Sequence, residues 1–178
     1  MTDPADSPRP RRTSRERPAI SISPGLDLMR VLLHVSHGIE RVSMRMEAAL
    51  GVTAQQRLVL RVVGRHPGIT PGRLAEHLHL DPGTISALVR RLEAKRLIRR
   101  APDPRDGRRI TLGLTESGRA LDRPQSGTVE HVFDQLVRAE DPETSREVQA
   151  FLTKLAERLE HAAADAGQER AVQSTKTT

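Results

Sequence analysis

Residues 70–114 read TPGRLAEHLHLDPGTISALVRRLEAKRLIRRAPDPRDGRRITLGL, and this stretch decides the fold. Thr70-Pro71 and Asp81-Pro82 each combine a residue that caps a helix N-terminus with a proline suited to the first helical turn. Two short helices joined by a tight turn are therefore expected. Another helix is expected before them, because Thr53 and Gln56 have the T-x-x-Q spacing of a capping box.

A basic hairpin is expected after these helices. Residues 97–100 and 109–114 are the expected strands, since residues 101–108 between them carry two prolines and an Asp-Gly pair, which is turn chemistry. The order of helix, turn, helix and hairpin is that of a winged helix-turn-helix. The expected fold class is therefore mostly α-helical, with one small hairpin.

The second helix of the pair is the one expected to read DNA. The residues that should face the core share an i, i+3, i+4, i+7 spacing: Ile85, Leu88, Val89 and Leu92. The opposite face is small, polar and cationic, with Gly83, Ser86, Ala87, Arg90, Arg91 and Ala94. Such a face can enter a major groove and donate to phosphates or base edges. Thr84 and Ser86 lie near the helix N-terminus, where the dipole also favours a phosphate.

The charge distribution favours double-stranded DNA as the partner. The 178-residue chain has a formal net charge of +6, from 29 Lys and Arg against 23 Asp and Glu. Nine basic residues lie between Arg90 and Arg109, whereas residues 130–165 hold nine acidic residues and four basic ones. Among Phe, Trp and Tyr the chain has only Phe133 and Phe151, which excludes modules that stack bases on aromatic side chains.

Apolar helices flank this unit on both sides. Between residues 28 and 49 the apolar positions alternate at spacings of four and three, and residues 148–159 repeat that spacing, as helices packed on other helices do. The expected organisation is a disordered basic tail (1–19), an N-terminal dimerisation helix (20–50), a winged helix-turn-helix lobe (51–121), C-terminal dimerisation helices (122–166) and a disordered tail (167–178).

Residues 53–121 also carry a family resemblance. The wing motif Asp103-Pro104-Arg105-Asp106-Gly107-Arg108 and the helix start Leu114-Thr115-Glu116-Ser117-Gly118 resemble the D-P-x-D-x-R and L-T-x-x-G signatures of the MarR family of bacterial transcription regulators. The flanking helices are similar to the dimerisation layer of that family, so the resemblance covers about residues 25–165. It implies a homodimer that represses from a pseudo-palindromic operator and is released by a small phenolic or anionic ligand.

The resemblance also implies roles for individual residues. The two recognition helices of the dimer would enter successive major grooves, and Arg108 would insert into the flanking minor groove, whose narrow form attracts arginine. Asp106 is expected to support the wing rather than to contact DNA. The expected DNA-binding residues are Arg73, Thr84, Ser86, Ala87, Arg90, Arg91, Arg96, Arg105, Arg108 and Arg109.

The sequence departs from the family pattern at two places. Arg96 follows the recognition helix where the family usually has glycine, the residue that most easily ends a helix there, and a phosphate contact is one role for its side chain. Pro124 falls within the helix that follows the wing. In members of the family, this helix is commonly unbroken. An interruption near Pro124 and Gly127 is therefore expected.

His34, His37 and Arg41 share one face of the first helix at i, i+3 and i+7. They are the expected ligand-binding residues, because this cluster could meet a carboxylate; a plain polar helix face and a metal site are the alternatives. His77 and His79 could also be taken as metal ligands, but they fall in the turn of the helix-turn-helix, between packed leucines. Neither a metal site nor a cofactor is expected.

Several classes of protein are excluded. The patterns H-E-x-x-H, G-x-S-x-G, G-x-G-x-x-G and the P-loop do not occur, so no catalytic residues are expected. No apolar run approaches the roughly 18 residues of a membrane span, and the chain has no cysteine, so a cytoplasmic protein is expected, nucleoid-associated when it is bound to DNA. The alternatives are a ligand-independent architectural DNA binder and a winged-helix scaffold for protein interactions.

Overall fold

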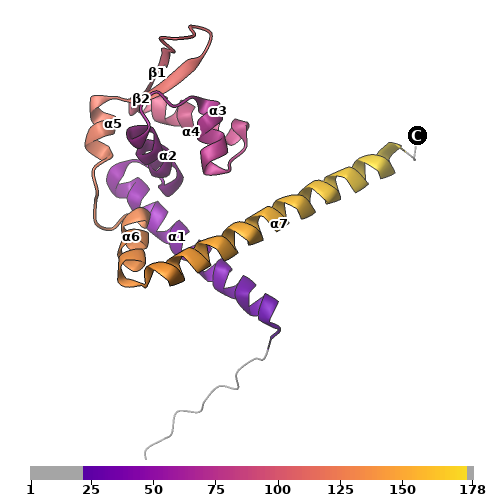
Figure 1. Ribbon diagram of the computed structural model, residues 1–178. Coiled ribbons are helices and arrows are strands. Elements are labelled where there is room, and N and C mark those ends of the chain that lie inside the picture. The colour runs from indigo at the N-terminus through magenta and orange to yellow at the C-terminus, as the bar shows by residue number, and fades with distance from the viewer. Residues whose placement is uncertain (1–21, 176–178) are drawn as a thin grey trace, which may run out of the picture. The chain divides into compact units, whose positions relative to one another are not determined.

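The computed structural model describes residues 22–175, with side chains through residue 165 (Figure 1). The chain divides into two units, residues 1–36 and 37–178. The first helix, α1 (Pro24–Leu50), begins in the first unit and continues into the second. The basic tail expected at residues 1–19 lies outside the described residues.

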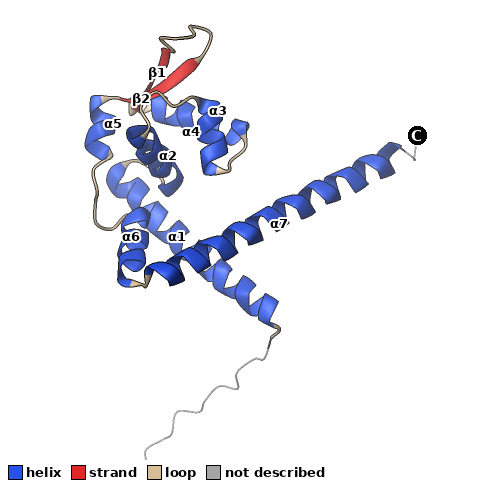
Figure 2. Cartoon of the chain, viewed as in Figure 1, coloured by secondary structure: helices blue, strands red, loops and turns tan. Residues whose placement is uncertain are grey.

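The described part of the second unit consists of helices and one hairpin (Figure 2). Its helices after α1 are α2 (Ala54–Arg65), α3 (Pro71–Leu78), α4 (Pro82–Ala94), α5 (Glu116–Leu121), α6 (Val129–Ala139) and α7 (Pro142–Thr175). The strands β1 (Ile98–Pro102) and β2 (Ile110–Leu114) pair antiparallel, with Ile98 opposite Leu114. β1 extends two residues past the predicted strand, because Ala101 and Pro102 join the ladder. The predicted winged helix-turn-helix is confirmed.

The predicted helix starts are also confirmed. The capping box at α2 is present. At α3 the hydroxyl of Thr70 accepts the N–H of Arg73 across 3.3 Å, and at α4 the carboxylate of Asp81 accepts the N–H of Thr84 across 2.8 Å. Each bond satisfies a backbone donor that the first helical turn leaves without a partner. The caps therefore fix where α2, α3 and α4 begin.

One apolar core joins α2, α3, α4 and the hairpin. Its buried members are Val52, Val59, Leu60, Val63, Leu74, Ala75, Ile85, Leu88, Val89, Leu92, Ile98, Leu112 and Leu114. The inward face predicted for α4 lies entirely within this core. The loop before α3 pairs with β2, because the carbonyl oxygen of Ile69 accepts the N–H of Leu112 across 2.9 Å. The hairpin therefore has an anchored base, while residues 104–109 at its tip are exposed.

The glycine of the L-T-x-x-G motif lets α5 approach the hairpin. Thr115 caps α5 by accepting the N–H of Gly118 across 3.0 Å, and its own hydroxyl donates to the carbonyl oxygen of Arg96 across 2.6 Å. A Cβ at Gly118 would overlap the carbonyl oxygen of Leu97. A larger residue at position 118 would therefore push α5 away from the start of β1.

The predicted interruption after the wing is confirmed. α5 ends at Leu121 and α6 begins at Val129, after a loop in which Gly127 has a φ of 76°. The other end of the chain differs from the prediction of a disordered tail at residues 167–178, because α7 includes residues 167–175. Five of its nine residues are Ala, Gln, Glu or Arg, which favour helices, and Gly167 alone costs only about 1 kcal/mol. Residues 176–178 lie outside the described part.

Candidate DNA-binding interface

α4 presents a small and basic face to solvent. Ser86, Arg90 and Arg91 are exposed, and Ala87 is half-buried at the edge of the core. These four residues follow one another along the outer side of the helix, opposite the side that packs in the core. The face has the side-chain sizes and the charge that a helix in a major groove requires.

Thr84 has a structural role at the start of α4. Its hydroxyl donates to the carboxylate of Asp81, in addition to the bond from its backbone N–H. The hydroxyl bond, followed by the backbone bond, holds the pKa of Asp81 below its usual value of 3.8, because both stabilise the carboxylate. The hydroxyl predicted to contact DNA is therefore already engaged within the chain.

α4 ends in a Schellman motif around Arg96. The N–H of Leu97 donates to the carbonyl oxygen of Leu92 across 2.9 Å, and the N–H of Arg96 donates to that of Glu93 across 2.8 Å. Arg96 has a φ of 56°, in the left-handed region where a side chain costs roughly 1–2 kcal/mol. The chain thus keeps a helix end suited to glycine although it has an exposed arginine there.

Two aspartates shape the tip of the hairpin. The carboxylate of Asp103 accepts the N–H of Arg105 across 2.8 Å, and that of Asp106 accepts the N–H of Arg108 across 3.1 Å. Asp106 also pairs with the guanidinium of Arg109 at 3.3 Å. These bonds lie within the loop, and they leave the side chains of Arg105 and Arg108 exposed at its surface.

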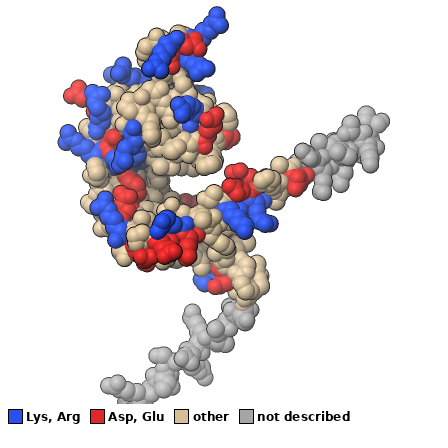
Figure 3. All heavy atoms as spheres, viewed as in Figure 1, with Lys and Arg blue, Asp and Glu red and all other residues tan. Residues whose placement is uncertain are grey.

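Basic side chains gather over this part of the molecule. Figure 3 shows Lys and Arg at the hairpin tip and on the surface beside it, and a group of acidic side chains near the turn between α6 and α7. Arg73 is exposed at the start of α3 and Arg99 on β1, while Arg100 pairs with Glu93 at 3.0 Å. A polyanion lying across α4 and the wing would meet several cations at once.

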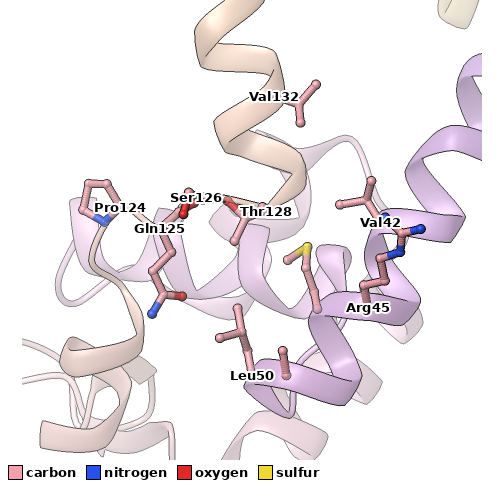
Figure 4. Close-up of a pocket in the computed structure, with 11 residues that line it drawn as sticks. Val42, Arg45, Leu50, Pro124, Gln125, Ser126, Thr128 and Val132 are labelled. Carbon is pink, nitrogen blue, oxygen red and sulfur yellow. Dashed lines mark hydrogen bonds between the residues drawn. The ribbon is translucent and has the colours of Figure 1, made fainter.

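A cavity of about 740 Å³ lies beside the loop between α5 and α6 (Figure 4). Its walls come from the last turns of α1, from the loop and from the start of α6, and they include apolar Val42, Met46 and Val132. Arg45 adds an exposed guanidinium. The Oε1 atom of Gln125 is buried there and has no hydrogen-bond partner among the described residues. The volume is in the range of small-molecule sites.

The predicted ligand-binding residues lie elsewhere on α1. His34, His37 and Arg41 are exposed, and this cavity is lined by other residues. The ring of His77 lies edge-on to that of His66, with centroids 5.7 Å apart. Within residues 22–165, no three His, Asp or Glu side chains are grouped as metal ligands would be. No described helix is long and apolar enough to cross a membrane.

Two arginines of α2 make contacts that the sequence pattern did not indicate. Arg57 is fully buried and Arg61 is half-buried, and both donate to the chain that follows α5. The position of Arg57 in the helix does indicate that its side chain is buried, because it lies next to Gln56 and three residues before Leu60, both of which are buried. Its partners, however, are more than 60 residues away in the sequence.

The fold and its basic face are those of a winged helix-turn-helix protein. Residues 50–109 match the model of the MarR family. The chain is 36% identical over 86 residues to the HTH-type transcriptional regulator TtmR of Methylorubrum extorquens, in an alignment that covers 48% of this chain and 44% of TtmR. Over its winged helix-turn-helix lobe, the chain is similar to regulators of the MarR family. It spans about half the length of the curated relatives that it matches at 35% identity or more.

Two solved structures extend the likeness beyond the lobe. The DNA complex of MepR from S. aureus is 28% identical, covers 78% of this chain and 99% of MepR, and has a TM-score of 0.61. PcaV from Streptomyces coelicolor, in complex with its natural ligand, is 25% identical, covers 75% of this chain and 92% of PcaV, and has a TM-score of 0.59. The likeness therefore includes the flanking helices as well as the winged helix-turn-helix.

Proposed function

We propose that the protein is a homodimeric, DNA-binding transcription regulator, which represses from a pseudo-palindromic operator and is released by a small ligand. One observation carries the proposal: a single lobe holds two basic surfaces. These are the small outer face of α4 and the hairpin tip, which exposes Arg105 and Arg108. The complex of MepR with DNA and the name of TtmR as a transcriptional regulator support it.

Each part of the lobe has a role in this proposal. The major groove receives the outer face of α4, with Ser86, Ala87, Arg90 and Arg91, and Thr84 lies close to the DNA backbone at the helix start. Phosphates are contacted by four further arginines, Arg73, Arg96, Arg105 and Arg109. Arg108 enters the minor groove. Asp106 supports the wing, in keeping with its bonds to the two residues that follow Gly107.

The apolar side chains of α6 and α7 support a homodimer. The exposed ones are Val132, Phe133, Leu136, Val137, Val148, Phe151, Leu152 and Leu159. Phe133 and Phe151 are each about half exposed, at 48% and 53%. Faces of this kind are covered when two copies associate, and a two-fold axis between the copies matches a palindromic operator.

The cavity beside the α5–α6 loop is the proposed effector site, with Arg45 for an anionic group and the Oε1 atom of Gln125 for a hydrogen-bond donor. His34, His37 and Arg41 are the second candidate, proposed from the sequence. The variants Arg45→Ala and Arg41→Ala distinguish the two sites when release of DNA is measured with 4-hydroxybenzoate and benzoate as probes. Loss of ligand-induced DNA release in Arg45→Ala alone supports the cavity, and loss in Arg41→Ala alone supports the second candidate.

Selection of binding sequences from random duplexes, followed by sedimentation of the complex, tests the proposal as a whole. The expected result is an enriched inverted repeat bound by two chains. Binding without an enriched sequence would favour the architectural DNA binder. Absence of binding to any duplex would favour the scaffold for protein interactions.

A further inference from the structure

One face of α2 is turned toward the interruption between α5 and α6. Arg57, Arg61 and Gly64 lie on this face at i, i+4 and i+7. The side chain of Arg57 is 0% exposed, which is unusual for an arginine. A buried guanidinium is tolerated only when its donors are matched by acceptors. The hydrogen-bond partners of Arg57 therefore indicate its structural role.

Arg57 holds the end of one helix and the start of the next. Its Nη1 atom donates to the carbonyl oxygen of Leu121 across 2.5 Å, and its Nη2 atom donates to that of Arg123 across 2.8 Å. Its Nε atom donates to the carboxylate of Glu130, in the first turn of α6. The planar guanidinium suits this task, because it presents its donors in a fixed fork.

Arg61 and Gly64 complete the contact. The Nη1 atom of Arg61 donates to the carbonyl oxygen of Asp122, and it lies 3.1 Å from the carboxylate of the same residue. A Cβ at Gly64 would overlap that carboxylate. The carbonyl groups of Leu121 and Asp122, which the C-terminus of α5 leaves without intrahelical partners, and that of Arg123 in the loop thus accept hydrogen bonds from α2.

The interruption would otherwise be a hinge. Residues 122–128 have no regular structure, and this loop contains Pro124 and Gly127. On one side of the loop, α2 shares the core of the DNA-binding lobe with α4. On the other side, α6 carries part of the apolar face that the proposed function assigns to the dimer. The contacts of Arg57 therefore connect α2, in the lobe, with the loop and with the first turn of α6.

We propose that Arg57 is a positioning residue for DNA binding: it fixes the orientation of α4 relative to α6, and through that orientation it sets the separation of operator half-sites that the dimer accepts. This inference rests on the proposed function. A dimer reads two half-sites one helical turn apart, so lobes held at one angle accept one spacing, while lobes on a loose loop accept several.

Because the chain has no cysteine, introduced cysteines can carry spin labels, and the proposed role of Arg57 in orienting α4 relative to α6 can be tested without DNA. Spin labels on Ala94→Cys in α4 and Gln135→Cys in α6, both exposed positions, report the distance between the two helices by double electron–electron resonance in full-length protein diluted with unlabelled chain. The expected result is one narrow distribution for the wild type and a broad one for Arg57→Met. Arg65→Met is the matched control, because Arg65 is an exposed arginine of the same helix. A narrow distribution in folded Arg57→Met would overturn the proposal.

The second measurement uses the selected operator and duplexes whose half-sites are one or two base pairs further apart, at one salt concentration. We expect the wild type and Arg65→Met to lose about tenfold or more in affinity at the shifted spacings, and Arg57→Met to lose less than about threefold. Equal discrimination by Arg57→Met and the wild type would contradict the proposal.

Two further outcomes are informative. If Arg57→Met does not fold, Glu130→Gln removes only the ion pair, and its unchanged distance distribution and spacing preference would overturn the proposal. If the wild type selects no sequence, the proposed function fails and the role in DNA binding fails with it. The spin-label distances would still show whether Arg57 holds α4 and α6 together, so the two failures are distinguishable.

Discussion

The N–H of Leu97 donates to the carbonyl oxygen of Leu92 across 2.9 Å, and the turn that this bond closes forces Arg96 into the left-handed region. The recognition helix is therefore ended by an arginine at a position that glycine would occupy without strain. The same residue is exposed beside the proposed DNA-binding face. Its backbone conformation and its charge can be tested separately.

Arg96→Gly is expected to raise the melting temperature, because glycine relieves up to about 1 kcal/mol of left-handed strain, or roughly 2–4 °C for a chain of this size. Arg96→Ala keeps the strain and is expected to melt no higher than the wild type. Both variants are expected to lower the salt dependence of DNA binding by about one counterion. An unchanged salt dependence in both would show that Arg96 touches no phosphate.

Arg108→Ala is expected to weaken operator binding about tenfold to a hundredfold, because an arginine inserted in a narrow minor groove makes a contact that water cannot replace. Fluorescence anisotropy with the selected operator measures the loss. Arg138→Ala, an exposed arginine of α6, is the control that removes the same charge. Equal affinities for the two variants would contradict the wing assignment.

Arg90→Ala and Arg91→Ala are each expected to lower the slope of log affinity against log salt by about one, if each side chain neutralises a phosphate. Titrations at several salt concentrations give the slope for each variant. Arg158→Ala on α7 should leave the slope as it is in the wild type. A variant whose affinity falls with an unchanged slope has instead lost a base contact.

Asp106→Ala separates wing support from simple charge. Removal of an acid raises the net charge, so electrostatics alone predicts tighter binding to any duplex. Loss of the bonds from Asp106 to Arg108 and Arg109 predicts weaker binding to the operator, because the tip is no longer held. We expect operator affinity to fall while affinity for scrambled DNA stays level or rises. Tighter operator binding would disprove the supporting role.

Asp81 gives the recognition helix a pH-dependent start. Its pKa is lowered in the folded state, first by the hydroxyl and then by the N–H of Thr84, so its contribution is present in full above the usual value of 3.8 and is lost as the pH falls through the lowered value. Asp81→Ala should therefore melt below the wild type at pH 7, and the difference should shrink in acid below the lowered value. Asp81→Asn, which caps without titrating, should show no such change. If the difference in melting temperature between Asp81→Ala and the wild type is the same at every pH, the cap at Asp81 does not contribute a pH-dependent stability.

Local sequence determined much of this fold. Thr70, Asp81 and Thr115 mark helix starts through hydrogen bonds to residues three positions away, which a single chain segment reveals by itself. The alternation at Ile85 and Leu88 likewise fixes the inward face of α4. Pro124 predicted the interruption for a similarly local reason, because it cannot donate a helical hydrogen bond.

The contacts between distant segments could not be predicted in the same way. Arg57 meets Glu130 only because α2 and α6 come together in the folded chain, and nothing in the residues around either one indicates the partner. The cavity with Arg45 and Gln125 depends on the path of the loop after α5. The helix α7 continues past Gly167, contrary to the prediction, because one glycine does not outweigh the good helix formers around it.

A fluorescence-anisotropy titration of the full-length protein measures whether it recognises a DNA sequence. It compares DNA from upstream of its own gene with a scrambled duplex of equal length, at about physiological salt. We expect a preference of roughly a thousandfold or more for the natural duplex, which is the range of specific regulators. Equal and weak binding to both duplexes, with no sequence enriched from random DNA, would contradict the proposed function.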